Sequence, residues 1–185
     1  AVAGVVAALA LSVALTVMVD SFRGAVADWL DQVLPADLYA RTAASAGAAD
    51  GAFLDPAFVA AAARLPGVAR TEALRAVPLG FDPALPAVTL IARPLVPAPG
   101  ARADDAPAAV PLVGELKPPH PTLPTVYASE GFVALHGGGP GRVLRLPGAG
   151  RGAEVFVRGV WRDYARQHGT LLIDDADWRR LSGDT

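Results

Sequence analysis

The first 19 residues, AVAGVVAALALSVALTVMV, form an uninterrupted apolar run in which Ser12 and Thr16 are the only polar side chains. As a helix, this run measures about 28 Å, close to the roughly 30 Å hydrocarbon core of a bilayer. A secretory signal peptide has a shorter apolar region, placed between a basic start and a small-residue cleavage site. Residues 1–19 are therefore predicted to be a transmembrane helix, and their content of Ala and Gly favours packing against other membrane helices.

Residues 20–35 continue the helix with an amphipathic pattern and are predicted to be a stalk that ends at Pro35. Three Asp and one Arg follow the apolar run, which is the wrong composition for a cytoplasmic flank. Residues 20–185 are therefore expected on the extracytoplasmic side of the cell (inner) membrane. The candidate coupling residues of the stalk share one helical stripe: Phe22, Val26, Trp29 and Leu30.

Composition narrows the function classes. With 16 Lys+Arg against 18 Asp+Glu, the chain has a net charge of −2, which disfavours nucleic-acid binding. The chain contains no cysteine, which excludes disulfides, thiolate nucleophiles and cysteine-ligated metal sites. Hydrophobic residues make up 52% of the chain, too many for a disordered segment.

Residues 36–185 carry mixed helix and strand patterns, so the fold class is predicted to be α+β. Expected strands cover 37–42, 68–79, 88–92, 126–128, 142–146, 153–161 and 170–173, the pair 142–146 and 153–161 forming a hairpin. Expected helices run from Asp55-Pro56 to Leu65, from a Ser129 cap to Leu135, and from an Asp174 cap to Leu181. Residues 94–124 hold nine of the 17 prolines and are expected to be an irregular excursion.

No motif supplies catalytic, cofactor-binding or metal-binding residues. The glycine clusters 137–141 and 148–152 each precede a strand pattern and lack the Lys of a phosphate-binding loop, so they are predicted to be turns. His120, His136 and His168 do not have zinc-site spacing. The acidic group at 174–177 lacks the glycine and distal Glu of a calcium loop. We therefore expect a protein that is not an enzyme.

The segment 161–169, WRDYARQHG, concentrates amphipathic side chains between two expected strands. Trp, Tyr and Arg are favoured at protein interfaces, so Trp161, Arg162, Tyr164 and Arg166 are candidates for a partner-facing loop. An equally weighted alternative is a packed corner in which the Trp and Tyr rings fill a small core.

Several stretches resemble the FtsX/MacB-type permeases of ABC transporters. They are residues 18–30 with 36–39, 65–68, 126–132, 159–164 and 169–174, which together sample most of the chain outside the proline-rich segment. The sequence departs from the usual family pattern at Arg142, where an Asp is common, and at Gly138, where an apolar residue is common.

This resemblance implies a permease whose extracytoplasmic domain handles a lipid, lipoprotein, peptide or partner protein. ATP would bind a separate cytoplasmic ABC ATPase, and the stalk would couple its hydrolysis to the outer domain. Other transmembrane helices of the same permease, and in some cases a second permease copy, would complete the assembly. The extracytoplasmic domain is expected to be incomplete at its C-terminus. The residue patterns alone support a single-span sensor or ligand-binding domain of a signalling receptor equally well.

Overall fold

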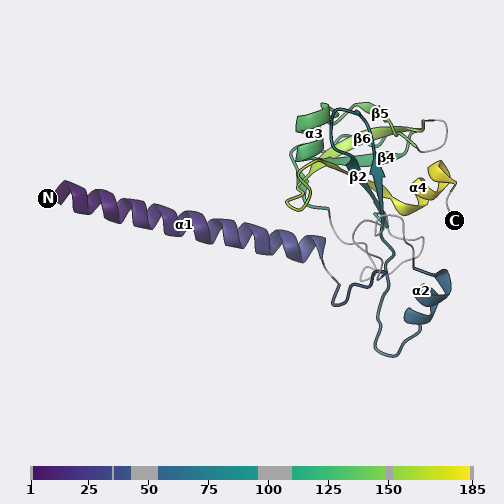
Figure 1. Ribbon diagram of the computed structural model, residues 1–185, viewed down its shortest axis with the longest axis horizontal. Helices are drawn as coiled ribbons and strands as arrows, with labels where there is room; N and C mark the ends of the chain where they lie inside the picture. The colour runs from purple at the N-terminus through teal and green to yellow at the C-terminus, as the bar shows by residue number, and fades with distance from the viewer. Residues whose placement is uncertain (1, 35, 43–53, 96–109, 149–151, 184–185) are drawn as a thin grey trace. The chain divides into compact units, whose positions relative to one another are not determined.

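The computed structural model describes residues 2–34, 36–42, 54–95, 110–148 and 152–183 (Figure 1). The chain divides into two compact units, one containing residues 1–37 with 108–111 and the other residues 38–107 with 112–185. The first unit is dominated by a long helix and the second by a mixed β-sheet with short helices. This arrangement confirms a long apolar N-terminal helix followed by an α+β domain.

The helix α1 spans Val2–Val33, 32 residues without a break, and is about 48 Å long. It is long and apolar enough to cross a membrane. Its two apolar-segment hydroxyls are satisfied inside the helix, because Ser12 Oγ donates to the Ala8 carbonyl and Thr16 Oγ1 to the Ser12 carbonyl, each at 2.9 Å. Pro35, expected to end the helix, lies outside the described residues.

The second unit contains a seven-stranded sheet in the order β1-β2-β7-β4-β6-β3, with β5 also paired to β6. Its strands are β1 (Arg75–Leu79), β2 (Val88–Arg93), β3 (Leu112–Val113), β4 (Thr125–Ser129), β5 (Val143–Arg145), β6 (Glu154–Trp161) and β7 (Thr170–Asp174). The pairs β2–β7 and β4–β6 are parallel and the other pairs antiparallel. The hairpin of β5 and β6 confirms the sequence prediction.

One face of the sheet carries the core, because alternate side chains of its strands are fully buried. The helices α3 (Glu130–His136) and α4 (Asp175–Ser182) contribute Phe132 and Trp178 to this core. Both helices start where the sequence predicts. Ser129 Oγ accepts a hydrogen bond from the Phe132 amide at 3.2 Å, and an Asp174 carboxylate oxygen accepts one from the Ala176 amide at 3.0 Å.

The described end of the proline-rich segment packs along β6, which differs from the expected irregular excursion. Leu112 and Val113 pair with Trp161 and Val160 as β3. Further along, the Lys117 amide donates to the Arg158 carbonyl at 2.8 Å, and the Arg158 side chain returns a bond from Nε to the Lys117 carbonyl at 3.0 Å. The prolines here do not prevent pairing because β3 lies at the edge of the sheet.

Three element boundaries predicted from the sequence are wrong. Residues 37–42 form no strand, since Leu38 and Tyr39 are exposed and the segment pairs with no described strand. The helix α2 (Pro56–Ala62) begins at the predicted Asp55 cap but ends before Leu65, whose helical conformation is disfavoured by the following proline. The strand expected over 68–79 is paired only at 75–79, because β2 offers partners no further than Arg93.

Candidate functional site

The connection between β6 and β7, residues 162–169, carries several polar and aromatic side chains in a short loop. Trp161 ends β6 and is 3% exposed, so it packs into the domain. Tyr164 is 46% exposed and lies on the surface. The packed-corner interpretation therefore holds for the Trp but not for the Tyr, whose ring is exposed on the surface.

The buried carboxylate of Asp163 stabilises this loop through hydrogen bonds. The side chain of Asp163 has no exposed area. One of its oxygens accepts a hydrogen bond from the Ala165 amide at 2.9 Å, and the other accepts one from Thr170 Oγ1 at 2.7 Å. Ser129 Oγ in turn accepts from the Thr170 amide at 2.8 Å, which connects the loop to the start of α3. These bonds fix the loop backbone at both of its ends.

Two glycines allow the loop to approach α3 closely. Gly169 has φ +98°, and a Cβ at this position would lie 2.8 Å from Phe132 Cα and 3.0 Å from its amide nitrogen. A Cβ on Gly131 would lie 3.2 Å from the Gln167 carbonyl oxygen. Only glycine therefore fits at 169 without movement of the backbone.

Arg162 forms an ion pair with Glu130, the first residue of α3. Its Nε lies 3.4 Å from a Glu130 carboxylate oxygen, and its guanidinium carbon lies 5.9 Å from the Tyr164 ring centroid. The hydrogen bond to Glu130, followed by the charge of Glu130 and the proximity of Tyr164, raises the pKa of Arg162 above its ordinary value. Arg162 therefore contacts both the Glu130 carboxylate and the Tyr164 ring, the latter within cation–π range.

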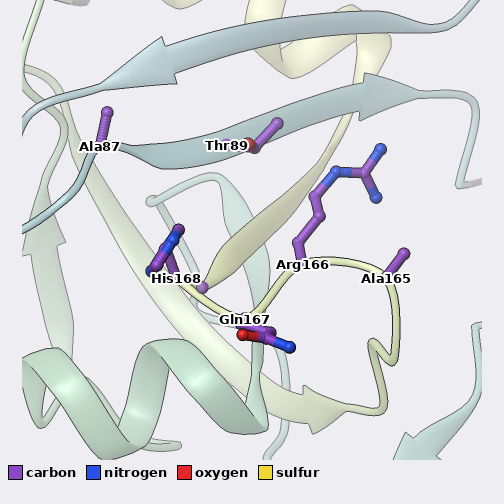
Figure 2. Close-up of a pocket in the computed structure, with 7 residues that line it drawn as sticks. Ala87, Thr89, Ala165, Arg166, Gln167 and His168 are labelled. Carbon is purple, nitrogen blue, oxygen red and sulfur yellow. The ribbon is translucent and has the colours of Figure 1, made fainter.

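An open depression of about 360 Å³ lies between this loop and the start of β2 (Figure 2). Figure 2 shows the Arg166 side chain extending from the loop toward the strand that carries Thr89. The depression is lined by Ala87, Thr89, Ala165, Arg166, Gln167, His168 and Gly169. Arg166 is the one arginine or lysine among these described lining residues, and it forms an ion pair with the covered Asp163 carboxylate at 3.6 Å.

The four predicted stalk residues all lie on α1, in the first unit, whereas the four loop residues lie in the second. Within α1, Phe22 is 65% and Leu30 40% exposed, while Val26 and Trp29 are half-buried. The stalk candidates therefore share one helix, whereas the loop candidates are divided between the end of β6 and the connection that follows it.

Sequence reasoning did not single out Asp163, which organises the loop. A carboxylate in a loop between two strands is ordinarily solvated, and the only signal for its role is Thr170, which starts the next strand. In the structure, the Asp163 carboxylate and the Thr170 hydroxyl both lie on the buried side of the loop, where they form a hydrogen bond.

The described residues contain no group of three or more His, Asp or Glu side chains that could hold a metal ion. His136 packs instead against the rings of Phe132 and Phe81, with centroid distances of 5.0 and 5.7 Å. In the first glycine cluster, Gly137 caps α3 with φ +68°. In the second cluster, residues 149–151 lie outside the described part of the chain.

Comparison with known proteins identifies no relative: no family model matches the chain, and neither a curated protein nor a solved structure does. The site is therefore interpreted from its own geometry.

Proposed function

We propose that this chain is part of an ABC transporter permease of the FtsX/MacB type. The observation that carries the proposal is the unbroken helix α1, whose apolar segment continues into an amphipathic one without a change of element. A continuous helix can transmit an axial movement from the membrane to the region beyond it, as a coupling element must.

The sheet domain supports a binding role in this proposal. Its loop 162–169 is fixed by buried hydrogen bonds and carries the exposed Tyr164 together with Arg162 and Arg166. Aromatic and Arg side chains on a rigid support are suited to recognition of a partner. In this proposal the domain lies on the extracytoplasmic side, performs no catalysis itself, and responds to ATP hydrolysed by a cytoplasmic ABC ATPase.

Membrane topology is the first test. The chain has no cysteine, so a single cysteine at Ser21 or at Ser182 can be labelled without background. We expect a cysteine at either position to react with a membrane-impermeant maleimide added to intact spheroplasts. A cysteine on the cytoplasmic side of the membrane should remain unlabelled. Labelling of Ser21→Cys and Ser182→Cys only after lysis would contradict the proposed orientation.

Coupling is the second test. Trp29→Asp replaces a half-buried stalk side chain with a charge and should uncouple ATP hydrolysis from transport while membrane insertion is retained. The measurement is ATPase activity and transport by the permease reconstituted with the ABC ATPase that co-purifies with it. Gln32→Asp, on the exposed side of the same helix, is the matched control. Co-purification of a kinase instead of an ATPase would favour a sensor.

A further inference from the structure

We propose that the depression between the 162–169 loop and β2 binds a single carboxylate of an acidic peptide segment. Arg166, Gln167 and His168 line it, and the Arg166 side chain extends toward the strand that carries Thr89 (Figure 2). Arg166 Nη1 forms an ion pair with Asp163 Oδ2 at 3.6 Å, a separation too long for a direct hydrogen bond. The inference uses the same loop as the proposed function but requires neither a membrane role nor ATP.

Asp163 is the acidic partner of Arg166 in this ion pair, but its oxygens are hydrogen-bonded to other groups of the loop and of β7. Its side chain is fully covered, and its two oxygens accept the short bonds from Ala165 and Thr170. The Arg166 side chain, by contrast, is 39% exposed. The guanidinium therefore has N–H donors that a ligand can reach, and Figure 2 shows it extending toward the strand that carries Thr89.

The geometry favours a carboxylate over a phosphate. One guanidinium matches a planar carboxylate through two parallel hydrogen bonds and neutralises its single charge. Phosphate groups carry nearly two charges and are usually held by clusters of arginines. Among the described residues, Arg166 is the only arginine or lysine that lines the depression.

The surroundings favour a peptide as the source of that carboxylate. Ala87 and Ala165 form part of the lining. Tyr164, the residue before Ala165 in the sequence, has an exposed ring. A peptide can place its acidic side chain in the depression and its neighbours against this apolar rim. Because the hydrogen bonds of Asp163 already order the loop, little of the binding free energy is lost in ordering it on binding.

The test is a titration of the full chain, labelled with ¹⁵N and ²H in dodecyl maltoside micelles, with the peptide acetyl-Ala-Glu-Ala-amide. We expect saturable amide shifts at 165–169 and none with acetyl-Ala-Gln-Ala-amide. Arg166→Gln should weaken binding at least about tenfold, while Arg166→Lys, which keeps the charge but loses the planar fork, should weaken it less. Unchanged amide positions in the rest of the domain verify that each variant is folded.

Arg145→Gln is the matched control, because Arg145 is exposed and lies 3.6 Å from Glu154, the same distance that separates Arg166 from Asp163. This variant should bind the acidic peptide as the unaltered chain does. Equal shifts with the Gln peptide, or binding that survives in Arg166→Gln, would overturn the proposal. Tighter binding of inorganic phosphate than of the acidic peptide would also overturn it, by replacing the carboxylate with a phosphate ligand.

Discussion

Substitution of Gly169 by Ala should strongly destabilise the sheet domain. The residue has φ +98°, where a side chain costs roughly 1–2 kcal/mol of backbone strain. The added Cβ would also meet Phe132 Cα at 2.8 Å and the Phe132 Cβ at 3.1 Å, and relief of such overlap costs about 1–3 kcal/mol. The expected loss in free energy of unfolding is therefore about 2–5 kcal/mol, a large part of the total stability of an ordinary domain.

Two further glycines separate these contributions. Gly137 has φ +68°, but a Cβ at this position would meet no described atom within 4 Å, so Gly137→Ala should cost only the strain, about 1 kcal/mol. Gly80 has neither a positive φ nor a close described neighbour, so Gly80→Ala should change stability by less than about 0.5 kcal/mol. The difference between the variants at 169 and 137 then measures the contact between the loop and α3.

The assay is urea unfolding of the full chain in detergent, followed by tryptophan fluorescence. Trp161 and Trp178 are buried in the sheet domain and report its unfolding. Trp29 lies in α1, so all variants are compared in a common Trp29→Phe background. Equal destabilisation by Gly169→Ala and Gly137→Ala would refute the reasoning, because it would mean that the loop does not lie against α3 in solution.

Three other substitutions test separate features. Asp163→Ala leaves the Thr170 hydroxyl and the Ala165 amide without their acceptor, so the same urea assay should show a loss of about 3 kcal/mol, and an unchanged midpoint would contradict the buried network. Arg158→Ala removes the bonds to the Lys117 carbonyl and the Tyr127 hydroxyl and should speed deuterium uptake at 112–117, whereas Arg145→Ala should not. Pro78→Thr adds an amide donor to the edge strand β1 and should promote concentration-dependent association in sedimentation experiments; an unaltered sedimentation profile would show that this edge does not need the proline.

Local signals in the sequence were sufficient to predict the elements whose structure depends on residues close to them in the chain. The caps Asp55, Ser129 and Asp174 each lie where an acceptor side chain precedes a helical pattern, and each makes the expected bond. The alternation of β6 likewise predicts its buried and outward residues. These features depend on neighbours within a few residues, so the sequence contains the information that specifies them.

Features that depend on distant partners were not predicted. The pairing of β3 depends on β6, about 50 residues further along the chain, and proline content alone favoured an irregular segment. The role of Asp163 depends on which side of the loop faces Thr170. The depression beside Arg166 depends on the parallel register that places Thr89 opposite Thr170. Sequence periodicity carries no information about such pairings, since it describes one element at a time.

The place of β7 in the sheet has a consequence for biogenesis. This strand is the last described strand in chain order, yet it lies between β2 and β4 and pairs with both. Until residue 174 has left the ribosome and any translocation channel, β1–β2 and β4–β6 can form only as separate pieces with open edges. The sheet therefore closes only after β7 has been synthesised, and until then its earlier pieces expose the strand edges that β7 later covers.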